Sequence, residues 1–330
     1  MTKTKSIPIN GKRPLVNGAA SRQKIDSRWA MQVLERLSEA APFSIKIRVS
    51  QVDVDTFSHA TYSSYVRWQS IAVDEFLLRC EPQLATAFQS KRLRIRTTGA
   101  GFRYFAGANY GDVIHLRLKL ATSDGNNLDV SSVFHSGESR NGQLLAEGWQ
   151  SFAVHELKEG RCKLIQGLPI PTRDEHIPML KDFWTALRDS TYLHNGIRVF
   201  FRHLDQFGKV HIVNLFEWAG AARESYLLDT VPAYQEVTKR PLLWVTAAAS
   251  QECFGDAEFG DVLAVRVFSE RVRRCSFDFV LDTINVSRGY LMARGRQTTA
   301  FIDAKQQKVT QIPPEVLEVV KRIQVRPAPS

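Results

Sequence analysis

Two stretches of the chain decide its architecture: DTFSHATYSSYVRWQSIAVDEFLL at residues 55–78 and DQFGKVHIVNLFEWAGAARESYLL at residues 205–228. Both fit the pattern D-x-F-[SG]-x9-W-x3-A-x3-[FY]-L-L, and the second begins 150 residues after the first. Self-similarity at a fixed separation is the signature of one structural unit present more than once.

The similarity continues downstream of both stretches. YGDVIHLR (110–117) matches FGDVLAVR (259–266), and LLAEGWQ (144–150) matches LMARGRQ (291–297). The three blocks keep the same order and nearly the same spacing, which argues against chance. The chain therefore contains one module twice.

Each copy begins with an alternating strand, Ile45, Ile47 and Val49 in the first and IRVFF (197–201) in the second. A loop with an aspartate follows, then a helix. Trp68, Ala72 and Phe76 are spaced at i, i+4 and i+8, which places them on one face of that helix.

Four long segments with period-two alternation come after the helix, a pattern that favours antiparallel strands. In the second copy they are residues 242–254, 261–272, 275–286 and 290–302. One long helix against one antiparallel sheet is an α+β layer architecture.

These patterns divide the chain into four parts. Residues 1–42 form a basic flexible leader with a helix, and 43–157 the first module. Residues 158–194 form a linker with a helix at 181–193, and 195–330 the second module with a C-terminal helix at 313–323. A length of 330 residues fits about two domains.

Composition narrows the class of protein. The net charge is +10, and six basic residues precede the first acid, Asp26. This leader is either solvated or attracted to an acidic partner, while nucleic acid is disfavoured because no recognised binding motif accompanies the charge. The four cysteines lack zinc-ligand spacing, and the chain shows no secretory signal or membrane span, so we expect a reduced cytoplasmic protein.

The first copy carries a family resemblance. VDVDTFSHATYSSYVRW (52–68) resembles the D-x-x-G-H-V-N-N-x-x-Y signature of 4-hydroxybenzoyl-CoA-thioesterase-like proteins, with Asp55, His59 and Tyr65 on the pattern. Ser58 stands where the signature has Gly. The resemblance implies a hotdog fold, in which a long helix is wrapped by an antiparallel sheet.

The second copy is similar to a narrower group, the thioesterases of enediyne polyketide biosynthesis, through VNLFEWAGAARESYLL (213–228) and ARGRQTTAFI (293–302). The two resemblances together imply a tandem hotdog thioesterase whose modules form a pseudo-dimer. Its expected activity is hydrolysis of an acyl-CoA or acyl-carrier-protein thioester, with a polyketide or fatty acyl chain. No cofactor or metal is implied, and further homo-oligomerisation remains open.

Thioester hydrolysis needs a carboxylate or activated water and donors aimed at the developing oxyanion. Asp55 and Asp205 precede the two helices and are either catalytic or loop-capping carboxylates. The remaining catalytic candidates are His59, Arg223 and Glu224, and the substrate-binding candidates are Tyr65, Asn214 and Asp74.

The family rule of antiparallel helices would bring Arg223 and Glu224 to the loop of Asp55 and His59. The opposite site would combine Asp205 and Lys209 with Val73 and Asp74, and it would lack the helix arginine because Val73 stands where the second copy has Arg223. Two alternatives stay open: a non-catalytic acyl- or carrier-binding scaffold, and a hotdog dehydratase. The dehydratase is disfavoured because neither helix offers His beside an acid at a matching place.

Overall fold

The computed structural model describes residues 42–325 except 56–57, 81, 91–92, 124–126, 138–140, 159–160, 165–191, 233 and 307, together with Gln32. The basic leader with its expected helix (Gln32 apart) and residues 181–191 of the expected linker helix lie outside the described residues. The last two residues of that expected helix, Tyr192 and Leu193, are instead the start of a strand.

The first module is a long helix against an antiparallel sheet. Its helices are α2 (Tyr62–Cys80) and α3 (Gln83–Gln89). Its strands are β1 (Phe43–Arg48), β2 (Leu93–Tyr104), β3 (Val113–Ser123), β4 (Asn127–Ser136), β5 (Leu144–Lys158) and the short β6 (Arg161–Leu164).

The second module repeats this order. Its helices are α5 (Ile212–Thr230), α6 (Tyr234–Thr238) and α7 (Pro314–Arg322). Its strands are β7 (Tyr192–Arg198), β8 (Leu242–Cys253), β9 (Val262–Glu270), β10 (Ser276–Asn285), β11 (Tyr290–Asp303) and β12 (Lys308–Val309).

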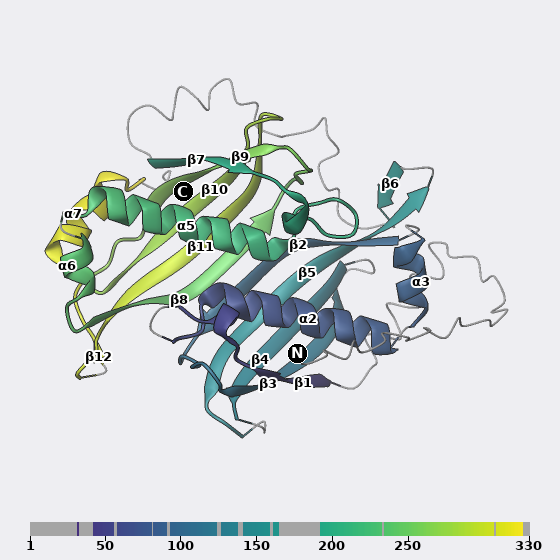
Figure 1. Ribbon diagram of the computed structural model, residues 1–330, viewed down its shortest axis with the longest axis horizontal. Helices are drawn as coiled ribbons and strands as arrows, with labels where there is room; N and C mark the ends of the chain where they lie inside the picture. The colour runs from purple at the N-terminus through teal and green to yellow at the C-terminus, as the bar shows by residue number, and fades with distance from the viewer. Residues whose placement is uncertain are drawn as a thin grey trace, which may run out of the picture.

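The two sheets join into one. The strand order is β1-β3-β4-β5-β2-β8-β11-β10-β9-β7, with β6 on β5 and β12 on β11 (Figure 1). The seam is the antiparallel pair β2–β8, from Gly99↔Glu252 to Arg103↔Ala248. The fold is therefore α+β, two tandem hotdog modules arranged as a pseudo-dimer.

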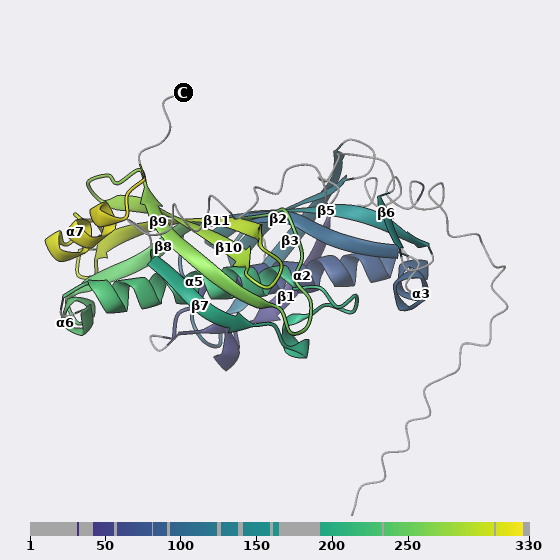
Figure 2. The same cartoon turned by 90° about the horizontal axis from the view of Figure 1, so that it is seen from above.

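Helices α2 and α5 lie on the same face of this sheet and run in opposite directions (Figures 1 and 2). Trp68, Ala72 and Phe76 are all buried, as their shared face predicts. The helices touch at the start of α2, where the Tyr62 hydroxyl donates to the Phe216 carbonyl and leaves no room for a side chain at Gly220. Among the described residues, no helix is long and apolar enough to cross a bilayer.

One expected strand is shifted. The segment 197–201 was predicted as extended, but β7 ends at Arg198, and Phe201–His203 form a 3-10 turn. The strand starts at Tyr192, earlier than alternation indicates, because Gly196 at φ 82° lies at a register shift between His194 and Ile197 that breaks the alternation. The short elements α3, α6, β6 and β12 were not predicted, since they span too few residues to show a period.

Candidate active site

The two aspartate loops are held by their own carboxylates. Asp205 Oδ1 accepts from the amides of Phe207 (2.8 Å) and Lys209 (3.0 Å), and Asp55 Oδ1 accepts from the amide of His59 (3.1 Å). Such bonds fix an Asx-type turn. Ser58 has a φ of 65°, which explains why the family signature has glycine at this position.

The carboxylate buried deepest in the first loop is Asp53, which sequence reasoning missed. Its Oδ1 accepts from Trp68 Nε1 (3.1 Å) and Arg67 Nη2 (2.8 Å). His203 takes the matching place against Trp218, with ring centroids 5.2 Å apart. The recurrence of Trp68 as Trp218 indicated that the residue in contact with the indole ring is important. That residue differs between the copies, since it is Asp53 in the first and His203 in the second.

Three predicted site residues have contacts that organise the fold. Tyr65 is 2 % exposed and packs edge-on against Trp68, Tyr104 and Phe134 in the core. Asn214 Nδ2 donates to the carbonyl of His203 (2.9 Å), which ties the first turn of α5 to its loop. His59 forms a bridge with Asn109 and is exposed.

A cavity of about 510 Å³ lies between the second aspartate loop and α2. We call it the Asp205 site. Its walls come from both modules, because the antiparallel helices bring the start of α5 to the middle of α2. The lining residues include apolar and polar side chains from both modules, among them Val73, Asp74, Leu77, Arg94, Arg96, Thr97, Gln150, Phe152, Asp205, Phe207, His211 and Asp256.

One end of this cavity carries acid–base groups and the start of a helix. His211 is the N-cap residue of α5, and its Nδ1 accepts from the amide of Val213 (3.3 Å). Burial lowers the pKa of His211, partly opposed by Asp205, so the ring is neutral at pH 7. The N-terminal end of α5 adds the positive end of its dipole.

Asp74 lies on the α2 side of the same cavity. Desolvation by the surrounding residues raises the pKa of its carboxyl, and the neighbouring Glu75 raises it further, although the side chain is exposed at the mouth of the cavity. The structure thus brings Asp74 and Asp205 to one cavity, as the antiparallel pairing predicts.

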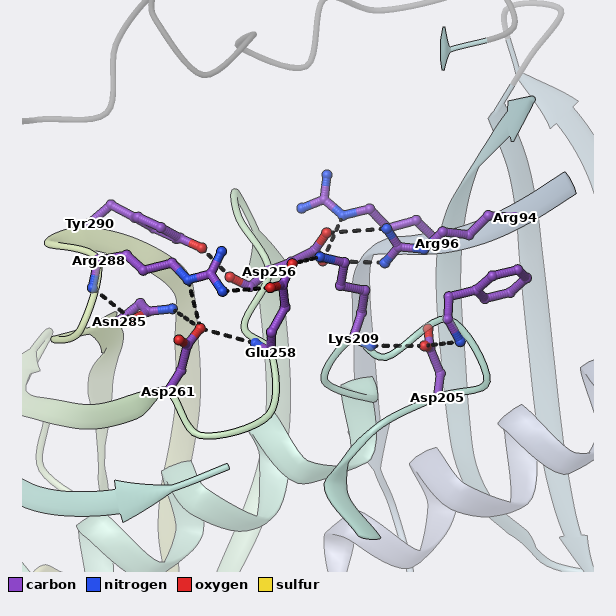
Figure 3. A network of polar contacts seen from close by, with 11 residues as sticks. Arg94, Arg96, Asp205, Lys209, Asp256, Glu258, Asp261, Asn285, Arg288 and Tyr290 are labelled. Carbon is purple, nitrogen blue, oxygen red and sulfur yellow. Dashed lines mark hydrogen bonds and ion pairs between the residues drawn. The ribbon is translucent and has the colours of Figure 1, made fainter. Parts of the chain in front are cut away.

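A second polar group, absent from the sequence prediction, lies where β2 runs past the seam. Arg94 and Arg96 are 7 % and 8 % exposed, and both pair with Asp256 from the loop after β8 (Figure 3). The helix at this site carries Val73 in place of an arginine, as expected, but Arg94 and Arg96, which were not predicted, line the cavity from β2.

The pseudo-symmetric counterpart, which we call the Arg223 site, is the start of α2 (Tyr62) with Arg223, Thr246 and Gln297. Arg223 Nη1 donates to Thr246 Oγ1 (3.0 Å) and Gln297 Oε1 (3.1 Å), and its guanidinium lies 5.6 Å from the Tyr62 ring centroid. Its Nη2 contacts Glu224, which is exposed. Arg223 therefore approaches the first module's helix start, as the antiparallel pairing predicts.

The two sites share their sheet residues but differ on the facing helix. Thr97 and Gln150 hold the places of Thr246 and Gln297, and Gln150 Nε2 donates to Thr97 Oγ1 (3.1 Å). Val73 stands where the other site has Arg223. The guanidinium fills in one site the space that is open in the other.

Comparison with known proteins now identifies the family. A model of the thioesterase-like superfamily matches residues 49–180 and 199–320, so both modules are covered. The chain belongs to this superfamily. Membership makes thioester hydrolysis the activity of the chain. No curated protein sequence matches it.

Solved structures of thioesterases have a similar fold. A putative oleoyl thioesterase from Lactobacillus plantarum is similar over 80 % of this chain and 98 % of its own, at 13 % identity and a TM-score of 0.59. A 12:0-ACP thioesterase from Umbellularia californica is similar over 78 % and 96 %, at 12 % identity and a TM-score of 0.57. The dynemicin thioesterase is similar over 41 % of this chain and 99 % of its own length, at 25 % identity and a TM-score of 0.39.

Proposed function

We propose that this protein hydrolyses an acyl thioester of CoA or of an acyl carrier protein, and that the reaction takes place in the Asp205 site. The observation that carries the proposal is the cavity itself, which combines apolar walls with Asp205, His211 and a helix start. An acyl chain fits against Val73, Leu77 and Phe152, while the thioester lies at the polar end.

Asp205 is the proposed general base. Both of its loop bonds are accepted by Oδ1, so Oδ2 is free to take a proton from water. The water oxygen attacks the carbonyl carbon, the C–S bond breaks, and the thiolate receives a proton. Amides at the start of α5 stabilise the oxyanion. Neutral His211 holds the first turn of that helix in place.

The remaining candidates take supporting roles. Asp74 faces the same cavity from α2 and contributes to substrate binding. Arg223 and Glu224 belong to the Arg223 site, which we propose is catalytically silent because the guanidinium fills it. We assign Asp55 and His59 to the same silent side, because their loop leads into the start of α2 and the Asp55 carboxylate holds that loop. Tyr65 and Asn214 support the fold of the two loops.

CoA and the carrier protein share a phosphopantetheine arm, and the net charge of +10 suits either an acidic carrier or the phosphates of CoA. The resemblance of the second module to enediyne thioesterases favours a polyketide or fatty acyl group.

A thiol-release assay with the purified chain and a series of acyl-CoA and acyl-pantetheine thioesters tests the proposal. We expect turnover of at least one acyl class without added cofactor. If the chain binds acyl thioesters but releases thiol from none of them, the proposal is wrong and the protein is an acyl-binding scaffold.

A further inference from the structure

Arg94 and Arg96 form a buried cationic group that the hydrolysis mechanism above does not use. Both guanidinium groups share a single carboxylate, Asp256. The bonds are long for charge-assisted pairs: Arg94 Nη1 to Oδ2 is 3.3 Å, Arg94 Nη2 to Oδ1 is 3.5 Å, and Arg96 Nε to Oδ1 is 3.2 Å. Two cations therefore compete for one anion.

The group also has unused donors. Arg94 Nε and Arg96 Nη2 are buried and have no hydrogen-bond partner. Figure 3 shows the Arg96 guanidinium extending beyond Asp256, with only its Nε bonded to the carboxylate. Arginine cannot shed its proton, so a buried guanidinium with unpaired N–H groups is costly unless an anion completes it.

The neighbouring charges do not supply this anion. Glu258 is bound to Lys209 and Arg288, and Asp261 to Arg288 and Asn285 (Figure 3). The raised pKa of Asp74 arises from desolvation and Glu75, with no contribution from either arginine. His155 is buried beside both arginines, and burial with their charge lowers its pKa to about 4, so it adds no charge.

The group is close to the reacting end of the cavity. The Arg94 guanidinium lies 6.0 Å from the Phe207 ring centroid, and the Phe207 amide donates to Asp205 Oδ1. Its surroundings include Phe152 and Leu77, which we assigned to the acyl chain. The phosphates of a carrier arm stay near solvent, whereas these arginines are more than nine-tenths buried.

We propose that Arg94 and Arg96 form a carboxylate subsite. The preferred acyl group then carries, besides its thioester, a free carboxylate or another small monoanionic group. One monoanion balances the excess charge of two guanidiniums and one aspartate and provides acceptors for Arg96 Nη2. This inference rests on the proposed function, since it places the acyl group in the Asp205 site. The subsite is specific to this site: Leu243, Val245 and Gly107 hold the matching positions in the other.

The test compares acyl groups of equal length with and without the carboxylate. Glutaryl and pentanoyl thioesters are assayed with CoA and with N-acetylcysteamine, which lacks phosphate. The variants are Arg96→Gln, Arg96→Lys and the control Arg103→Gln, an exposed arginine of the same strand. We expect a glutaryl preference that Arg96→Gln lowers ~10-fold or more on both carriers, that Arg96→Lys restores in part, and that Arg103→Gln leaves unchanged.

Two results would overturn the subsite. If Arg96→Gln slows every CoA ester equally and no N-acetylcysteamine ester, the arginines bind carrier phosphate. If it lowers only the melting temperature, with the glutaryl-to-pentanoyl ratio unchanged, they form an ion pair between modules. If the wild type releases no thiol from any ester, the proposed function fails, and calorimetry decides the subsite separately: glutarate binding that Arg96→Gln abolishes supports it, and absence of binding overturns it.

Discussion

The Asp205 site and the Arg223 site are built on the same plan and hold different contents. Each has a helix start facing the partner helix, and each has a threonine and a glutamine on the sheet beneath. In one, Val73 leaves a cavity of about 510 Å³; in the other, Arg223 binds the threonine and the glutamine directly. A single helix position therefore decides whether the shared frame is open or filled.

The two sites also differ in where their arginine side chains are attached. Both sites have guanidinium groups, but the Arg223 site has one on the helix and the Asp205 site has two on the strand. In the proposed function, the guanidinium on the helix fills the place that substrate takes in the Asp205 site, whereas the guanidiniums on the strand leave room for substrate. Counting residue types in each repeat would not reveal this difference.

The largest effect is expected from the two aspartates. Asp205→Asn removes the proposed base yet keeps an Oδ1 acceptor for the loop amides, so kcat should fall by at least ~10². Asp55→Asn should change kcat less than ~3-fold, because its site is filled. Steady-state kinetics on one substrate measures both. Equal losses in the two variants would mean that the sites do not differ as described.

A somewhat smaller effect is expected from Val73→Arg. By pseudo-symmetry the new guanidinium reaches Thr97 and Gln150 as Arg223 reaches Thr246 and Gln297. It fills the cavity, and we expect KM to rise and kcat/KM to fall by ~30-fold, about 2 kcal/mol of lost binding. Val73→Leu is the control, with a loss below ~5-fold. A Val73→Arg enzyme with wild-type KM would show that substrate does not use this cavity.

The reciprocal change affects stability rather than rate. Arg223→Leu removes the hydrogen bonds to Thr246, Gln297 and Glu224 from a side chain that is 12 % exposed, and it removes the contact with the Tyr62 ring. We expect a loss of about 2 kcal/mol in the free energy of unfolding, measured in urea, with kcat/KM nearly unchanged. A large loss of turnover without a loss of stability would instead place chemistry at Arg223.

The smallest effect concerns pH. His155 is buried in the first module, where Ile302 holds the matching position in the second. Its folded pKa of about 4 lies below the unfolded value of 6.5, so the unfolded chain binds more protons between these values and stability falls as pH drops below 6.5. Between pH 7.5 and 5.5 the loss is about 1 kcal/mol. Urea unfolding of His155→Gln should show a weaker pH dependence over this range; an identical slope would contradict the assignment.

The repeated blocks were enough to predict the α+β class, the tandem modules and the four long strands after the helix, because burial imposes period two on strands and i, i+4 spacing on α2. The family resemblance, through its antiparallel helices, predicted that Arg223 would lie near the start of the other helix. The sequence could not show that Asp55 and Asp205 bind their own loops, since the same residue type suits either role. Arg94, Arg96 and Asp256 were missed because they meet only where β2 runs past the seam, 160 or more residues apart in sequence.

The β2–β8 seam, five residue pairs long, has a further consequence. In a homodimer every inherited substitution appears in both sites at once, so a change that closes one site closes the other. Fusion into one chain removes that coupling: position 73 and position 223 mutate independently, although each site still takes its walls from both halves. One site can then lose its activity and be filled by stabilising contacts, while the other site changes its substrate. The covalent joining of the modules is what allows a symmetric frame to carry an asymmetric enzyme.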